Sequence, residues 1–399
     1  MRPKHLLSIV SLMLVACGGG IPTEEEDHVE NRARRPRAIS ESGHGAFEAA
    51  LAPMKDGAAV VWQDSRHGDA EIYYRLVGRS GQPLGPEHRL TRDDVPSYAA
   101  QVAGLEVEVP GGVERSIVVG WYEPVGPTAR LGAWGTNGKL HWHIALAQNG
   151  RNPVVVTHED RIFSAWLQTG PAGDTEVWAG WWDRTGTRLT DQRVVGAASA
   201  TTWNLNAAID EAGSAYVVWD AAVETQADEI WVARLSRDGE TLHRVTSDDG
   251  FSSRYPDLSL AGDRAALTWF DKRDGNEEIY LRVGSLLDVL NGAAAGARRI
   301  TNTPGESIGA YVAWNAGRFG LTWCDDSSGS YEVFFQSFNE AGDALEPAQQ
   351  LTHTAAHSLI PAIEPWESGF ALVWNELEIT DEPPHSPGAK AEIHFLHIP

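Results

Sequence analysis

The sequence predicts an all-β fold, a seven-bladed β-propeller of four-stranded antiparallel blades. Three observations predict it. A unit of roughly 50 residues recurs seven times, a length that suits a propeller blade and is long for a pair of helices. Each unit contains strand and turn signals in the same order. The two ends of the chain also carry complementary parts of a single unit.

A tryptophan ends the second strand of every unit. It follows a run of small and β-branched residues, such as AAVVW or AYVVW, and successive members are 45 to 59 residues apart. Neighbouring blades need a bulky residue between their sheets, and one buried aromatic side chain contributes about 150–250 Å² of buried surface. We therefore expect a structural core built on Trp62, Trp121, Trp166, Trp219, Trp269, Trp323 and Trp374.

Five other tryptophans fall outside this register. A binding role is more open for them, because the repeat does not assign them to the core: Trp181, Trp182, Trp203, Trp314 and Trp366.

The third strand of the unit is rich in aromatic and β-branched residues, as short antiparallel strands are. A turn containing glycine follows, and the unit ends in HRLT, HRVT, RRIT or QQLT, which predicts the fourth strand. No long segment has the helical apolar period, so helix should be nearly absent. The third strand is clearest at Glu71–Val77, Glu229–Leu235, Glu278–Val283 and Glu332–Phe338.

The ends of the chain predict how the ring closes. The seventh unit has its tryptophan strand at Phe370–Trp374 and a third strand at Glu392–Ile398, but no fourth strand follows. At the other end, Arg37-Ala38-Ile39-Ser40 is similar to a closing RRIT strand. We expect this segment to complete the last blade, because a closed ring removes most exposed sheet edges.

The N-terminus predicts an exported lipoprotein. Basic Arg2 and Lys4 precede an apolar stretch that is shorter than the roughly 20 residues needed to cross a bilayer. The stretch ends in Leu-Val-Ala-Cys17, which resembles the lipobox of bacterial lipoproteins. This resemblance implies cleavage before Cys17 and a lipid anchor on it. An ordinary secretory signal with an incidental cysteine is the alternative.

The expected organisation is a signal peptide over residues 1–16, the lipidated cysteine and a flexible tether over 17–36, and the propeller over 37–399. The tether prediction rests on its near absence of apolar residues. Glycine follows Cys17, which by the enterobacterial sorting rule implies the outer membrane. The other cysteine, Cys324, follows a core tryptophan and is interpreted as a small structural residue.

The charge argues against nucleic acid as a partner. The formal net charge is −23, and loss of the two basic residues of the signal peptide would make it two units more negative. Phosphates and anionic lipid head groups should repel such a body. We expect a membrane association through lipid on Cys17, and an envelope protein or polysaccharide as the partner.

Two units resemble the repeat of TolB-type β-propellers. The fifth unit, YPDLSLAGDRAALTWFDKRDGNEEIYLRV followed by RRIT, and the first, through DSRHGDAEIYYRLV and HRLT, are similar to it. The resemblance implies a propeller, an envelope setting and an interaction role. The chain departs from that family in its seven units, in its lipobox and in lacking the family's separate N-terminal domain.

No catalytic constellation is found, and no catalytic residue or resident cofactor is expected. No H-E-x-x-H, G-x-S-x-G, phosphate-binding glycine loop or paired C-x-x-C occurs. The segment His158-Glu159-Asp160 is interpreted as a solvated turn. His141 and His143 would face the same way on a strand, but a zinc site needs at least three protein ligands. Ser236-Arg237-Asp238-Gly239 is interpreted as a hairpin turn, although it faintly resembles a sialidase Asp-box.

Acidic and basic residues that follow the tryptophans, or lie between units, form the candidate binding face. One interpretation is structural, with Asp–Arg pairs and turn caps that shape each loop. The other is a calcium or cationic-ligand site, because carboxylates suit hard cations. The residues are Asp64, Arg66, Asp93, Asp94, Asp248, Asp249, Asp271, Arg273, Asp325 and Asp326.

The sequence leaves three functions open. The first is a non-enzymatic scaffold that binds a protein or polymer through the acidic loops and channel mouth, which is an inference from fold alone. The second is a glycan-binding or glycan-hydrolysing, sialidase-like propeller. The third is a structural lipoprotein without a small ligand.

Overall fold

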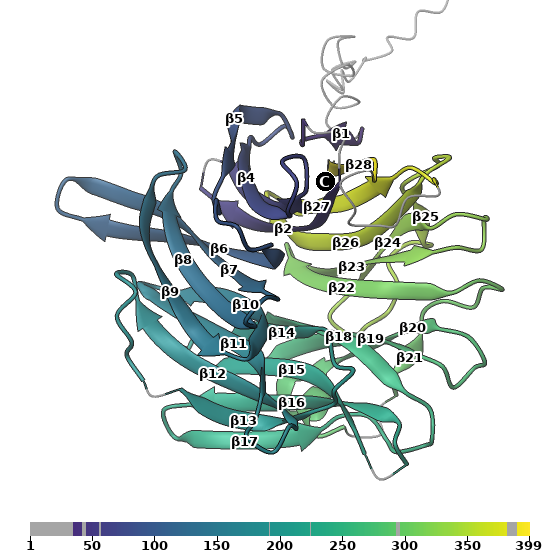
Figure 1. The fold of residues 1–399 in the computed structure, drawn as a ribbon. Helices are drawn as coiled ribbons and strands as arrows, with labels where there is room; N and C mark the ends of the chain where they lie inside the picture. The colour runs from purple at the N-terminus through teal and green to yellow at the C-terminus, as the bar shows by residue number, and fades with distance from the viewer. Residues whose placement is uncertain are drawn as a thin grey trace, which may run out of the picture.

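The protein is described by a computed structural model, and its seven four-stranded antiparallel sheets form a ring (Figure 1). The all-β, seven-bladed prediction is confirmed. Residues 1–34, with the predicted signal peptide, Cys17 and most of the tether, lie outside the described residues. The structure describes residues 35–41, 45–55, 57–190, 192–223, 225–292, 296–380 and 389–399.

Blades 1 to 6 each use four consecutive strands, and in every blade the strand that begins the unit is innermost. Blade 1 comprises β2 (Ala46–Met54), β3 (Gly57–Asp64), β4 (Glu71–Val77) and β5 (Pro83–Arg89). Blade 2 comprises β6 (Tyr98–Val109), β7 (Gly112–Glu123), β8 (Thr128–Gly135) and β9 (Leu140–Gln148). Blade 3 comprises β10 (Gly150–His158), β11 (Arg161–Thr169), β12 (Thr175–Asp183) and β13 (Arg193–Ala198).

The remaining blades repeat this order. Blade 4 comprises β14 (Leu205–Ile209), β15 (Ala215–Ala222), β16 (Asp228–Ser236) and β17 (Gly239–Arg244). Blade 5 comprises β18 (Ser253–Ala261), β19 (Arg264–Asp271), β20 (Glu278–Ser285) and β21 (Arg298–Arg299). Blade 6 comprises β22 (Ser307–Asn315), β23 (Arg318–Asp325), β24 (Glu332–Phe338) and β25 (Gln349–Gln350). Blade 7 comprises β26 (His357–Trp366), β27 (Gly369–Leu377), β28 (Ala391–Ile398) and β1 (Arg37–Ala38).

The N-terminal strand closes the ring as predicted. In blade 7, β1 pairs antiparallel with β28, with Arg37 opposite Phe395. Beyond β1, the Ile39 amide donates to the Ile393 carbonyl at 2.8 Å. The last blade therefore joins the two ends of the propeller through main-chain hydrogen bonds.

A hydroxyl in the closing segment of five blades explains the recurrent threonine. In blade 1, Thr91 Oγ1 accepts a hydrogen bond from the Ile72 amide at 2.9 Å. Ser40 does the same in blade 7, where its Oγ accepts from the Ile393 amide at 2.9 Å. The N-terminal segment thus supplies both the missing strand and its hydroxyl. Equivalent bonds are made in blades 4, 5 and 6 by Thr246, Thr301 and Thr352.

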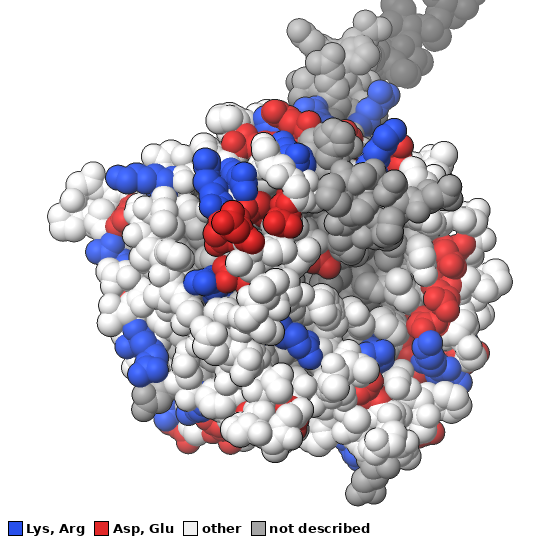
Figure 2. Space-filling model, in the orientation of Figure 1, with Lys and Arg blue, Asp and Glu red and all other residues white. Residues whose placement is uncertain are grey.

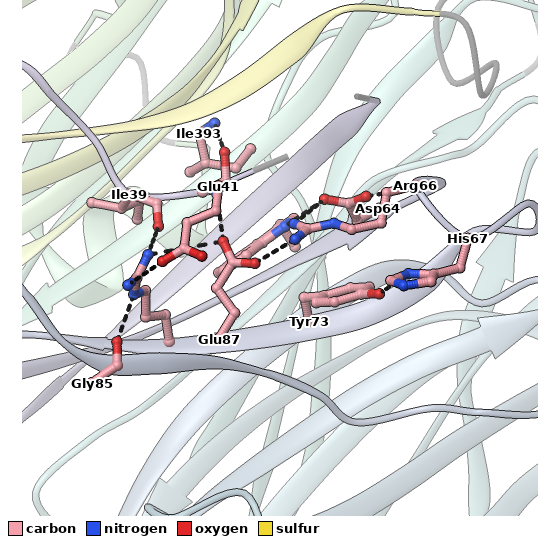
Figure 3. Close-up of polar contacts among 12 residues, drawn as sticks. Ile39, Glu41, Asp64, Arg66, His67, Tyr73, Gly85, Glu87 and Ile393 are labelled. Atoms are coloured by element: carbon pink, nitrogen blue, oxygen red, sulfur yellow. Dashed lines mark hydrogen bonds and ion pairs between the residues drawn. The ribbon is translucent and has the colours of Figure 1, made fainter. Parts of the chain in front are cut away.

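A polar network joins this closing segment to blade 1 (Figure 3). The Arg75 guanidinium donates to the Ile39 carbonyl at 2.9 Å and to the Glu41 carboxylate at 2.6 Å. The Glu41 amide donates to Glu87 at 2.6 Å, and Glu87 also accepts from Arg66 at 2.6 Å. Ring closure is therefore supported from the neighbouring blade as well as from within blade 7.

The repeated tryptophans are 0–2% exposed. In four blades the indole N–H donates to a side chain two residues later, as from Trp269 to Asp271 at 3.2 Å. This bond explains why Asp, Glu or Gln follows at that spacing, because a buried indole N–H needs an acceptor. The other three bonds join Trp62 to Asp64, Trp166 to Gln168 and Trp374 to Glu376.

Helix is almost absent, as predicted. In the described part of the chain only α2 (Leu286–Leu290) is an α-helix, and its first turn is capped by Ser285, whose Oγ accepts from the Asp288 amide at 3.2 Å. No described helix has the length and apolar character needed to cross a membrane.

Candidate functional site at the central channel

The loop Asp–Arg pairs of the predicted binding face are held within their own loops. Asp64 contacts Arg66 at 2.6 Å and is itself 1% exposed. Asp271 and Arg273 form the same pair in blade 5. Burial alone would raise the pKa of Asp271, but hydrogen bonds from Arg273 and Ser253 outweigh it and hold the pKa below its ordinary value.

Asp325 is satisfied without an arginine. It accepts hydrogen bonds from the Ser307 and Thr303 hydroxyls, both at 2.7 Å, and from the Ser327 amide at 2.9 Å. Burial raises the pKa of Asp325, and these hydrogen bonds lower it to a net value below the ordinary range. Its neighbour Asp326 accepts from the Glu306 amide at 2.7 Å.

The remaining loop carboxylates are spread around the ring. Asp93 and Asp94 lie in the exposed connection between blades 1 and 2, and Asp248 and Asp249 lie between blades 4 and 5. Asp249 lies 3.6 Å from Arg273. Within the described ranges, no three His, Cys, Asp or Glu side chains converge closely enough to hold a metal ion. On the face drawn in Figure 2, basic and acidic side chains alternate around the rim.

The main cavity is the central channel, with a volume of about 880 Å³. It is lined by the innermost strands of all seven blades, β2, β6, β10, β14, β18, β22 and β26, which surround the centre of the ring (Figure 1). The volume lies at the upper end of the range for small-molecule sites, about 300–1,000 Å³. The channel can therefore admit an extended ligand or the tip of a larger one.

A β-bulge recurs near the start of six innermost strands. In β2 the register shifts between Phe47 and Ala50, and Glu48 has a left-handed backbone with φ of 51°. Such a conformation is uncommon outside glycine, and bulges redirect side chains next to binding sites. The equivalent residues in the other five blades are Ala99, Asn152, Tyr255, Gly309 and Ile360.

Three carboxylates face the channel from different blades: Glu48 on β2, Asp257 on β18 and Glu364 on β26. Burial raises the pKa of Glu48 to about 7 and that of Glu364 to about 8. Burial also raises the pKa of Asp257 to about 6, although the Val312 amide donates to it at 2.8 Å. The described residues that line the channel include no lysine or arginine.

Two further acidic residues form a pair at the edge of the channel. Glu277 and Glu306 hydrogen-bond to each other, which raises the pKa of Glu306. Burial raises the pKa of Glu277, but Lys272 and Glu306 outweigh it and hold that pKa below its ordinary value. Glycosidase carboxyl pairs stand about 5–9.5 Å apart, so two directly bonded carboxyl groups do not have that geometry.

Aromatic side chains gather at the channel mouth between blades 2 and 5. Trp203 lines the channel and is 41% exposed. Its ring meets Tyr122 edge-on at 6.2 Å, and Tyr122 in turn lies 6.1 Å from Tyr98. Tyr255 also lines the channel and stacks on Phe270 at 5.3 Å.

The main chain that carries Trp203 is fixed by blade 3. Asn152 Nδ2 donates to the Trp203 carbonyl at 2.6 Å, and Arg151 donates to the Thr202 carbonyl at 2.7 Å. Asn152 is 8% exposed and lines the channel, and its Oδ1 has no hydrogen-bond partner among the described residues.

The other tryptophans outside the repeat register have different surroundings. Trp182 and Trp366 are buried at 2% and 4% exposure, so neither offers a surface for a ligand. Trp314 is half-buried and lines the channel, whereas Trp181 lines a smaller groove between blades 3 and 4. The repeat register correctly identifies seven buried tryptophans. Among the tryptophans outside the register, it does not distinguish the exposed Trp203 from the buried Trp182.

The minor motifs lie away from the channel carboxylates or in turns. His141 and His143 are exposed on the outer strand β9. Glu159 and Asp160 form the turn after β10, and Arg237 and Asp238 form the turn between β16 and β17. Cys324 is 2% exposed, and burial raises the pKa of its thiol to about 12.

The comparisons with known proteins identify no family. No protein-family model matches the sequence, and no curated protein matches it. A GH93 α-L-arabinofuranosidase of Fusarium graminearum, solved with arabinobiose, is 10% identical over 75% of this chain and 93% of its own, with a TM-score of 0.49. An acylaminoacyl peptidase of Pyrococcus horikoshii is 11% identical over 88% of this chain and 51% of its own, with a TM-score of 0.49.

A prolyl endopeptidase is 13% identical over 92% of this chain and 54% of its own, with a TM-score of 0.48. This chain therefore spans about half the length of the two peptidases. At such identities and TM-scores these likenesses assign no activity or substrate to this chain.

Proposed function

We propose that the protein is a non-enzymatic binding propeller of the bacterial cell envelope, held at the membrane by lipid on Cys17. Its partner is an envelope protein or polymer that enters the mouth of the central channel. The TolB-type resemblance of the first and fifth units supports an envelope interaction role. The lipobox-like N-terminus supports the anchor and an outer-membrane location.

The proposal rests on the channel mouth, because this concave site presents an exposed aromatic side chain. Trp203 offers an exposed aromatic face, whereas Asp64, Asp271 and Asp325 use their oxygens within their own loops. Exposed aromatic residues at a concave site are typical binding anchors. We therefore place the main contact at the mouth, with the loop carboxylates as its supporting rim.

Affinity capture with a matched control tests the proposal. The lipidated protein is captured from detergent-solubilised envelopes as wild type, as Trp203→Ala and as Leu242→Ala. Leu242 is 49% exposed on the outer strand β17, so its loss removes a comparable exposed apolar side chain far from the channel. We expect one partner to be recovered with wild type and Leu242→Ala and lost with Trp203→Ala. Equal recovery with all three would contradict a binding site at the mouth.

Glycan binding or hydrolysis is the second candidate, and the aromatic mouth favours it. Sugar rings pack on exposed aromatic faces, and Trp203 and Tyr255 both border the channel. Incubation with envelope polysaccharides, followed by analysis of released oligosaccharides and of retained polymer, separates the two forms of this candidate. Retention without release indicates a lectin, and release indicates a hydrolase.

A further inference from the structure

The three channel carboxylates lie at successive depths. The bulge residues Glu48, Tyr255 and Ile360 mark one common level near the start of their strands. Asp257 lies two residues beyond the bulge residue of its own strand, and Glu364 lies four residues beyond the bulge residue of its strand. With a rise of about 3.3 Å per residue, the carboxylates are offset by roughly 7 and 13 Å along the channel.

None of these three carboxylates has an ion-pair partner within the described part of the chain. The salt bridges of the structure involve other acids, and the neighbouring Glu277 already contacts Lys272. Glu364 lies close enough to Asp257 for their charges to repel, which adds to the effect of burial. A buried carboxylate that has no ion-pair partner is stabilised when a cation approaches it.

The remaining lining suits an organic cation better than a metal ion. Carboxylates spread over several levels cannot share one ion, in keeping with the absence of a convergent ligand group in the described residues. Three aromatic residues, Tyr255, Tyr311 and Trp203, also line the channel. Ammonium and guanidinium groups bind aromatic faces by cation–π attraction.

We infer that the channel binds an extended organic cation, with ammonium or guanidinium groups held in turn by Glu48, Asp257 and Glu364. The inference rests on the proposed function in one respect, because it takes the mouth at Trp203 as the entrance. Two sources have this chemistry: a free polyamine, or the lysine and arginine side chains of a partner segment.

Isothermal titration calorimetry on the full chain, purified from membranes in detergent, tests the inference. The probes are spermidine, the blocked peptide acetyl-Lys-Lys-Lys-amide and calcium chloride. We expect saturable binding of at least one of the two organic cations. Binding of spermidine alone indicates a free polyamine, and binding of the peptide indicates a basic partner segment. No saturable binding of either, or their displacement by equimolar calcium, would overturn the inference.

Amide variants locate the site. Glu364→Gln and Asp257→Asn should each weaken binding roughly tenfold, as loss of one charge-assisted hydrogen bond does. Each substitution replaces a carboxyl group that has no ion-pair partner in the described part of the chain by an amide of the same size, so the fold should be retained, and thermal unfolding checks this. The control is Glu340→Gln, which removes the same charge from an exposed position on the β24–β25 connection.

Equal weakening by Glu340→Gln would show surface attraction to an acidic protein and would overturn the channel site. The proposed function fails separately. If Trp203→Ala abolishes partner capture while no organic cation binds, the binding propeller stands and the cation site does not.

Discussion

Single side chains in this propeller divide into those that complete the core and those that face the channel. Trp269 is fully buried and hydrogen-bonded to Asp271, whereas Trp203 is 41% exposed at the mouth. Both are tryptophans in a chain that has 16. Their surroundings, set by the blade and not by residue type, decide what each contributes.

Replacement of these two tryptophans should separate stability from binding. Trp269→Ala should lower the free energy of unfolding by about 3–5 kcal/mol, because it leaves a cavity in the core. Trp203→Ala should change it by less than about 1 kcal/mol, because a partly exposed side chain buries less surface. Urea unfolding followed by circular dichroism measures both. Similar losses for the two variants would contradict the assignment of Trp203 to the mouth.

Glu229 predicts an unusual pH dependence. In blades 1 and 5 the equivalent acids Glu71 and Glu278 contact Arg89 and Arg299. Glu229 is fully buried and has no such ion pair within the described residues. Burial, together with the nearby negative charges of Asp249 and Asp271, raises its pKa to about 7.

The folded protein therefore holds this proton to a higher pH than the unfolded chain, whose glutamate pKa is near 4.5. Stability should fall as pH rises from about 4.5 to about 7, because ionisation is then easier in the unfolded state. Urea midpoints at pH 5 and pH 8 measure this, and Glu229→Gln should reduce the difference between them. Glu340→Gln, at an exposed site, should leave it unchanged. An unaltered difference in Glu229→Gln would assign the effect to Glu48, Asp220 or Glu364 instead.

At the scale of single strands, the closing segment of five blades carries one hydroxyl that bonds a main-chain amide of the neighbouring strand. The Ser40 hydroxyl, beside β1, accepts a main-chain hydrogen bond in blade 7, as the Thr301 hydroxyl does in blade 5, although the two residues are far apart in the sequence. The main-chain pairing of β1 is short, with two register pairs. Its side-chain bonds should therefore contribute strongly to ring closure.

Removal of the Ser40 hydroxyl should loosen the closing blade. Ser40→Ala leaves the buried Ile393 amide without its acceptor, which costs about 1–3 kcal/mol. Amide hydrogen exchange should accelerate in β28 and in residues 37–40, with little change in blade 4. The matched control is Ser247→Ala at an exposed position. Unchanged exchange in β28 would show that main-chain pairing alone closes the ring.

The sequence predicts those elements whose signals are local. The tryptophan repeat and the RRIT-like segment at Arg37–Ser40 indicate the blades and the closure, because strand periodicity and hydroxyl position are local. The bulges are not visible in the same way, since Glu48, Tyr255 and Ile360 share no residue type. The channel carboxylates are missed for the same reason, because only the ring brings Asp257 and Glu364 together.

The loop residues show the opposite limit. The Asp–Arg pairs are conspicuous in the sequence, but the sequence does not tell whether Asp64 and Arg66 meet each other or a ligand. The structure places them 2.6 Å apart, and Figure 3 shows the pair joined to Glu87. Recurrence of a motif after each core strand can reflect the demands of a turn as readily as those of a site.

At the scale of the whole molecule, the closed ring turns seven innermost strands into one channel. The outer strands carry exposed polar residues, while the channel gathers carboxylates and aromatic side chains from several blades. A rigid ring preorganises such a site, because no blade has to move to form it. We therefore place the main recognition site at the axis of the molecule, with the loop carboxylates around it in a supporting role.

Photo-crosslinking in living cells tests that placement most directly. The photo-reactive amino acid benzoylphenylalanine replaces Trp203 at the mouth or, in a matched strain, Leu242 on the outer strand β17. The account predicts one specific crosslinked partner from position 203 and none from position 242. Crosslinks that form from position 242 and not from position 203 would contradict it.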